Sequence, residues 1–222
     1  VSHEWIYQYV YRDRLCGGVL YKDLRWSRRQ RKKRIYRLRE RTRYGDAKSI
    51  EIRPKIVDKR KRLGDWEGDT IVGTQQKSSI ITLVERVSLY TKMIKPKTRG
   101  SNDTGKEIVK IFNQLTGAKH TITFDRGSEF ADYRLIEKQT GMGVFFAHAY
   151  SAYERGTNEN INGLIRQYFP KKTDFRLITD ADVQAVENLL NHRPRKKLGY
   201  LTPFEVYCAG DSKSMKTEIL AA

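Results

Sequence analysis

The chain has 222 residues, of which 38% are hydrophobic and 32% charged, and its formal net charge is +18. No uninterrupted apolar run approaches the roughly 18 residues that a membrane-spanning helix needs, and the start of the chain lacks the layout of a signal peptide. Two cysteines and four scattered histidines exclude a disulfide framework and a structural zinc site. We therefore expect a cytoplasmic protein with no membrane partner, built as one core-forming domain with an extension.

The positive charge is concentrated at the start of the chain. Residues 1–63 carry 21 Lys and Arg against 7 Asp and Glu, a net +14, whereas residues 64–222 carry 23 against 19, a net +4. Such a polycation binds phosphate backbones by counterion release, whatever the base sequence. A solvated helix face or a localisation tract is the alternative. We expect a DNA-binding arm whose central residues are Arg28, Arg29, Arg31, Lys32, Lys33 and Arg34.

The first 63 residues are predicted to form this basic arm and a linker. Ser2 is expected to cap a short helix at the start of the chain. Residues 44–64 are polar and contain Pro54 and Gly64, which is typical of a connecting segment. The core is expected to span residues 64–210, and residues 211–222 to form a tail.

From Gly64 the pattern changes to strands. Short β-rich runs at 67–73, 79–85 and 89–95 predict a meander of three antiparallel strands. A helix capped by Asn102 or Asp103 follows, with its apolar residues on one face.

The rest of the core alternates strand and helix. The predicted elements are a fourth strand at 121–124, a helix at 133–139, a fifth strand at 144–147 and a long helix at about 153–168. This order is that of a ribonuclease-H-like α/β fold, a mixed five-stranded sheet flanked by helices. Residues at the carboxyl ends of its strands face the functional crevice.

Three acidic residues lie in the segments least typical of a scaffold. Asp125 ends an apolar strand before a glycine turn, where an Asp can be purely structural. Asp69 lies in a β-rich run, where Asp is disfavoured, but Asp65, Glu67 and Asp69 share one strand face, so spacing does not choose among them. Glu159 lies in the first turn of the last helix, where it can merely complement the helix dipole. Three such acids in a chain with a polycation indicate metal-dependent chemistry on nucleic acid.

Four stretches resemble the signatures of the IS-thirty family of bacterial insertion-sequence transposases. They are residues 64–70 (GDWEGDT), 123–130 (TFDRGSEF), 154–171 (ERGTNENINGLIRQYFPK) and 191–205 (NHRPRKKLGYLTPFE). The resemblance covers most of residues 1–208, and the 33 residues between Asp125 and Glu159 match the spacing in this family. Alignment with the family selects Asp69 as the first acid.

The resemblance implies a DDE transposase in which Asp69, Asp125 and Glu159 are the catalytic residues and the metal ligands. Such an enzyme cleaves DNA at insertion-sequence ends and joins the 3′-hydroxyl to target DNA with two Mg²⁺ ions, for which Mn²⁺ substitutes. The resemblance also implies a homodimer on DNA and association with the bacterial nucleoid. Family members commonly begin with helix-turn-helix domains, and residues 1 to about 12 resemble the end of a truncated one. A related integrase or nuclease, or a noncatalytic DNA-binding regulator derived from a transposase, are the alternatives.

Further polar residues near the last helix are weaker candidates. Arg155 and Arg166 lie one turn before and two turns after Glu159, and either can hold a DNA phosphate or pair with a neighbouring acid. The amides of Asn158, Asn160 and Asn162 can orient ligands, contact DNA or cap the helix. The surface that binds the DNA backbone is expected to include Lys171, Lys172 and Arg195.

Overall fold

The computed structural model describes residues 2–23, 44–76, 78–148, 154 and 156–210. The chain divides into two compact units, Val1–Gly45 and Asp46–Ala222. The smaller unit contains α1 (His3–Leu15) and a 3-10 turn, η1 (Leu20–Asp23). The Ser2 hydroxyl accepts a hydrogen bond from the backbone N–H of Trp5, so Ser2 caps α1 as predicted. The basic stretch at 25–43, with its six predicted DNA-binding residues, lies outside the described residues.

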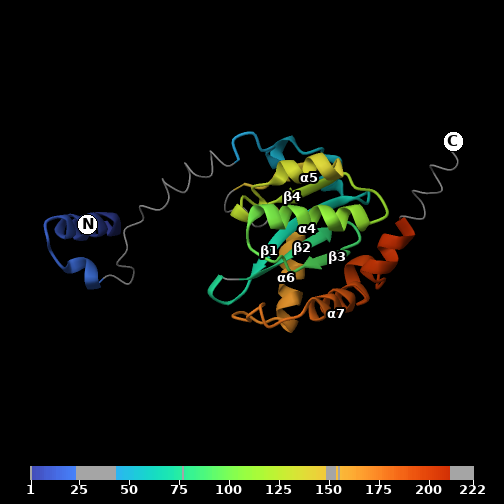
Figure 1. Cartoon of the computed structure of the whole chain (residues 1–222). Helices are drawn as coiled ribbons and strands as arrows, with labels where there is room; N and C mark the ends of the chain where they lie inside the picture. The colour runs from blue at the N-terminus through green and yellow to red at the C-terminus, as the bar shows by residue number, and fades with distance from the viewer. Residues whose placement is uncertain (1, 24–43, 77, 149–153, 155, 211–222) are drawn as a thin grey trace. The chain divides into compact units, whose positions relative to one another are not determined.

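The larger unit is built around the mixed five-stranded sheet that the sequence predicts. Its strands are β1 (Asp65–Val72), β2 (Ser79–Glu85), β3 (Thr91–Ile94), β4 (Thr121–Phe124) and β5 (Gly143–Phe146). They lie in the order β3-β2-β1-β4-β5 (Figure 1). The first three strands pair antiparallel, which confirms the meander, and β4 and β5 continue the sheet from β1 in parallel pairing. β1 is therefore the central strand, with β4 beside it.

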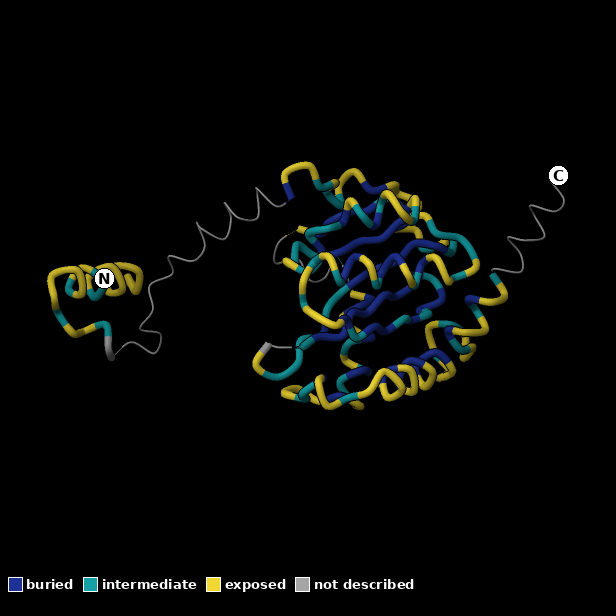
Figure 2. Tube along the Cα trace, viewed as in Figure 1, coloured by how far each residue is buried: buried dark blue, intermediate teal, exposed yellow. Residues whose placement is uncertain are grey.

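Two pairs of helices cover the two faces of the sheet: α4 (Ser101–Gln114) and α5 (Tyr133–Thr140) on one, α6 (Gly156–Tyr168) and α7 (Asp180–Asn191) on the other (Figure 1). Alternation along β1 supplies apolar residues to both faces. Trp66 packs edge-on against Phe112 of α4, with ring centroids 5.2 Å apart. Ile71 joins a buried cluster with Ile165 of α6 and Val183 of α7. Most of the sheet is consequently buried (Figure 2).

Short elements complete the larger unit: η2 (Ile50–Ile52), α3 (Ile56–Lys59), η3 (Thr74–Gln76), η4 (Ser128–Phe130), η6 (Lys196–Leu198) and a helix at 203–210. In the described parts of the chain, no helix has the length and apolar character needed to cross a membrane.

Residues 46–63, which the sequence assigns to the linker, belong to the larger unit. The backbone N–H of Phe146 in β5 donates to the Lys48 carbonyl, and Ser49 forms a parallel bridge with Phe146. Arg53 Nη1 donates to the buried hydroxyl of Thr123 at 2.8 Å. This segment therefore covers the β5 edge of the sheet, which would otherwise present unpaired backbone groups.

Two helices differ from the sequence prediction. The predicted cap of α4 at Asn102 or Asp103 is wrong: the helix begins at Ser101 with Gly100 as its N-cap. Asp103 lies inside the first turn, where its carboxylate accepts a hydrogen bond from the Thr98 hydroxyl. No sequence pattern predicted α7. Its start carries a capping box in which Thr179 and Asp182 each accept a hydrogen bond from the other's backbone N–H.

Candidate active site

Asp69 and Asp125 each follow the last paired residues of two neighbouring parallel strands, β1 and β4. The pairing of β1 with β4 ends with Glu67 beside Thr123. Two residues further along each chain segment come Asp69, still inside β1, and Asp125, just past the end of β4. Both predicted acids therefore lie two residues beyond the last paired residues of these adjacent parallel strands.

Gly68 of β1 leaves room for the aromatic ring of Phe124 from β4. A Cβ atom at Gly68 would lie 2.2 Å from Cε1 of Phe124, so only glycine leaves room for this ring. The Phe124 ring is fully buried and stacks on Phe130, with centroids 4.2 Å apart. Because Gly68 precedes Asp69 and Phe124 precedes Asp125, this packing lies directly beside the two predicted acids in sequence.

Helix α6 is anchored to β1 on both sides of Glu159. Asn162 Nδ2 donates to Asp69 Oδ2 at 2.8 Å, and the backbone N–H of Asn158 donates to Glu67 Oε2, with an N···O distance of 3.3 Å. Glu159 itself is exposed. Since one helical turn takes about 3.6 residues, Glu159 lies within a turn of the residue that binds Asp69. Asn162 is thus the direct link between the predicted acid on β1 and the helix that carries the predicted acid Glu159.

The three acids on β1 have different partners. Arg62 binds both carboxylate oxygens of Asp65, at 2.8 and 3.0 Å. Glu67 is fully buried and pairs with the buried Arg86 at 2.6 Å. Asp69 is only half-buried and is oriented by the α6 amide described above. Two of the three acids are therefore engaged in structural ion pairs, a distinction that sequence spacing does not make.

A second acid lies at the Asp125 turn. Asp125 Oδ1 accepts a hydrogen bond from the backbone N–H of Gly127 at 3.0 Å, so the turn-forming role weighed for this residue is present. A Cβ atom at Gly127 would lie 2.9 Å from Asp125 Oδ1 and 2.7 Å from Glu129 Oε2. Glu129, which the sequence analysis does not select, therefore lies close to Asp125. Its position in the 123–130 motif was the only available signal.

The donor chemistry at this edge of the sheet fits a hard divalent cation. Carboxylate oxygens are the ligands that Mg²⁺ and Mn²⁺ prefer, and hydrogen bonds such as those from Asn162 and Gly127 orient metal-binding carboxylates. Among the described residues, however, no group of three or more His, Cys, Asp or Glu side chains is arranged to hold a metal ion. The metal site formed by Asp69, Asp125 and Glu159 remains a prediction.

Comparison with known proteins identifies relatives over most of the chain, although no family model matches it. The chain is 40% identical over 207 residues to the transposase for insertion sequence element IS4351 of Bacteroides fragilis, covering 93% of this chain and 64% of that protein. It is 37% identical over 211 residues to the transposase for IS1086 of Cupriavidus metallidurans, covering 93% and 62%. It is 40% identical over 177 residues to transposase InsI for IS30A of Escherichia coli, covering 76% and 46%.

The chain is related to the insertion-sequence transposases. This relationship confirms the resemblance drawn from the four motifs. The chain spans less than two thirds of the length of these transposases.

Two solved structures have folds similar to that of this chain. The catalytic core domain of BIV integrase superposes with a TM-score of 0.52 at 17% identity, covering 68% of this chain and 98% of that domain. A chain in the simian T-cell lymphotropic virus intasome complex superposes with a TM-score of 0.54 at 16% identity, covering 66% and 54%. These likenesses confirm the predicted ribonuclease-H-like fold.

Arg166 has a structural role in this chain. Its guanidinium donates to the carbonyls of Val72 at 2.9 Å and Pro170 at 3.2 Å. Burial lowers the pKa of Arg166. The side chain thereby ties the end of α6 to the end of β1, and the predicted contact with a DNA phosphate stays a prediction.

The other predicted DNA-binding residues are dispersed. Lys171 and Lys172 are exposed just after α6. Arg195 is half-buried and donates to the Leu190 carbonyl at 3.1 Å. Arg155 lies outside the described residues.

A histidine and a glutamate form a clamp before α6. His148 Nδ1 lies 2.8 Å from Glu154 Oε1, and the backbone N–H of His148 donates to Glu154 Oε2 at 2.9 Å. Hydrogen bonding to Glu154 raises the pKa of His148. Burial raises the pKa of Glu154, but the contacts with His148 outweigh this effect and lower it overall. The clamp joins the segment after β5 to the segment before α6.

Proposed function

We propose that this chain is the catalytic part of a DDE transposase, which cleaves DNA at insertion-sequence ends and joins the freed 3′-hydroxyl to target DNA. The observation that carries the proposal is the hydrogen bond from Asn162 of α6 to Asp69, together with the parallel pairing of β1 and β4 that ends two residues before Asp69 and Asp125. Water is the nucleophile for the cleavage and the 3′-hydroxyl for the joining. The transposase relatives support this reaction class.

Each acid has a proposed role in holding Mg²⁺, or Mn²⁺ in its place. Asp69 and Asp125 would hold one ion, and Glu159 would complete the site. Two divalent ions, when bound, activate the attacking oxygen and stabilise the leaving oxygen of a phosphodiester. Asn162 keeps one oxygen of Asp69 oriented, and Gly127 does the same for Asp125. The proposal requires the exposed Glu159 to complete the site when metal and DNA are bound.

DNA is the proposed partner of the whole chain. The net charge of +18 favours binding to phosphate backbones, and the exposed Lys171 and Lys172 extend from the end of the helix that carries Glu159. A homodimer on DNA is the proposed assembly, because joining two insertion-sequence ends to one target needs two catalytic sites close together.

The proposal is tested by incubating the chain with supercoiled plasmid and short duplexes in Mg²⁺, Mn²⁺ or EDTA. We expect nicking or joining that requires metal and is lost in Asp125→Asn and Glu159→Gln, variants that keep side-chain size and remove charge. Asp180→Asn, at an exposed acid that starts α7, is the matched control and is expected to retain activity. Metal-independent DNA binding with no strand chemistry in any condition would instead favour the noncatalytic regulator.

A further inference from the structure

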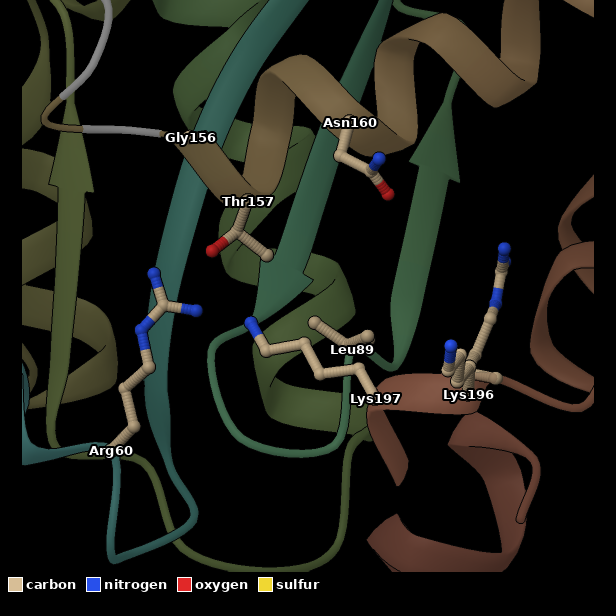
Figure 3. A pocket seen from close by; sticks show the side chains of 8 residues that line it. Arg60, Leu89, Gly156, Thr157, Asn160, Lys196 and Lys197 are labelled. Carbon is tan, nitrogen blue, oxygen red and sulfur yellow. The ribbon is translucent and has the colours of Figure 1, made fainter. Parts of the chain in front are cut away.

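A basic pocket lies at the start of α6. Its volume is about 410 Å³, and its charged lining residues are Arg60, Arg195, Lys196 and Lys197 (Figure 3). No carboxylate lines it among the described residues. The pocket draws these cations from the segment before β1 and from the η6 region, so they converge only in the folded chain.

The cations of the basic pocket are only partly compensated. Arg60 Nη2 lies 3.9 Å from Glu67 Oε1, but that oxygen is already bound by Arg86 at 2.6 Å. Loss of surrounding water lowers the pKa of Lys197, and the positive charge of Arg60 lowers it further. An anion in the basic pocket would offset this repulsion.

Thr157 supplies a neutral donor to the same space. Its side chain is buried, with 6% of its surface exposed, and its hydroxyl has no hydrogen-bond partner among the described residues. The hydroxyl points toward the space that the Arg60 guanidinium and the Lys197 ammonium group also approach (Figure 3). Buried polar groups are normally hydrogen-bonded, so this hydroxyl is available to donate to a ligand bound beside it. The pocket also lies at the first turn of a 13-residue helix, where the helix dipole favours a negative charge.

The basic pocket and the predicted metal site lie on different flanks of α6. Each residue advances about 100° around a helix. Thr157 and Asn160, which line the pocket, are three residues apart and share one flank. Glu159 and Asn162 share the other, where Asn162 reaches Asp69.

We propose that the basic pocket binds one phosphate group of a DNA backbone, held by Arg60, Lys197 and the Thr157 hydroxyl. A guanidinium, an ammonium group and a hydroxyl are complementary to the oxygens of a phosphate. The inference rests on the proposed function for the source of the phosphate. It assigns to α6 a second task, which is to fix the DNA backbone on the flank opposite Glu159.

Two variants and one control test the basic pocket. Lys197→Gln removes a charge, and Thr157→Val replaces the hydroxyl with a methyl group of similar size. Lys110→Gln, at an exposed lysine of α4 on the other face of the sheet, is the matched control. Circular dichroism melts establish that each variant is folded.

DNA affinity is measured by fluorescence anisotropy over a range of salt concentrations. We expect Lys197→Gln to weaken binding and to lower the slope of log K against log salt by about 0.9, the value for one phosphate contact. Thr157→Val should weaken binding about equally at every salt concentration, because a hydroxyl releases no counterion. Unchanged affinity and slope in folded Lys197→Gln would overturn the proposal.

A second arm distinguishes the source of the phosphate. Inorganic phosphate is titrated against the full chain at constant ionic strength, and backbone amide shifts at Gly156 and Thr157 are followed by NMR. Shifts that Lys197→Gln abolishes, together with its effect on DNA, support the proposal. Phosphate binding without any effect on DNA would overturn it in favour of a site for free phosphate.

The two proposals fail in different ways. If Asp125-dependent cleavage is absent while the pocket variants still weaken DNA binding, the catalytic proposal fails and the phosphate pocket stands. If cleavage depends on Asp125 but Lys197→Gln and Thr157→Val leave the DNA affinity unchanged, only the pocket proposal fails.

Discussion

Replacing Gly68 with alanine should disturb both the fold and the candidate active site. The new Cβ would lie 2.2 Å from Cε1 of Phe124, whereas carbon atoms in contact need about 3.5 Å, so the ring or the strand must move by more than about 1 Å. The ring cannot move freely, because it stacks on Phe130. We expect a loss of about 2–3 kcal/mol in the free energy of unfolding, near the upper end for overpacked cores. In a unit of this size, the melting temperature should fall by roughly 4–12 °C.

The same shift should reduce activity, since a misplacement of about 1 Å in catalytic groups costs on the order of 100-fold. Scanning calorimetry measures stability, and plasmid nicking in Mn²⁺ measures activity. Gly163→Ala is the matched control: its Cβ would meet nothing within 4 Å, so alanine should stabilise α6 by about 0.5–1 kcal/mol. In a Phe124→Leu background, Gly68→Ala should lower the free energy of unfolding by less than it does in the unmodified protein. The packing of Phe124 over Gly68 would be refuted if Gly68→Ala left the melting temperature unchanged. It would also be refuted if the loss of unfolding free energy were equal in both backgrounds.

Further predictions concern the ion pairs around the site. Arg86→Ala leaves the buried Glu67 carboxylate without its closest cation and should cost about 3–5 kcal/mol in denaturant unfolding; Lys48→Ala, which breaks an exposed pair, should cost less than about 1 kcal/mol. Equal costs for the two would contradict the assignment of Arg86 as a structural partner. His148 should titrate above its ordinary pKa of 6.5 by NMR, and Glu154→Gln should return it toward that value. Because the folded-state pKa of His148 is raised, the clamp stabilises the protein at low pH and this contribution is lost as pH rises through that pKa.

The sequence predicts the sheet well because its signals are local. The β-rich run at 79–85 and the apolar strand at 121–124 both coincide with observed strands. Strand alternation also places Asp65, Glu67 and Asp69 on one face, but it cannot say which acid is engaged elsewhere. Their partners come from outside the strand: Arg62 lies three residues before Asp65, whereas Arg86 reaches Glu67 only in the folded chain.

The basic pocket could not be predicted from the sequence, because its residues come together only in the folded chain. Arg60 and Lys197 are far apart in the chain. Thr157 lies in the 154–171 motif, in which the predicted functional residue is Glu159. The sequence indicates only a backbone-binding surface that includes Arg195. The convergence of these side chains at the start of α6 depends on how η6 folds back toward the sheet (Figure 3).

Binding of Mn²⁺ to the folded chain tests the central claim most directly. Electron paramagnetic resonance of free Mn²⁺, recorded with and without a short DNA duplex, counts the bound ions. The account predicts saturable binding that Asp69→Asn and Asp125→Asn each weaken at least tenfold and that Asp180→Asn leaves unchanged. Mn²⁺ binding that persists undiminished in folded Asp69→Asn and Asp125→Asn, or no saturable binding with DNA present, would contradict it.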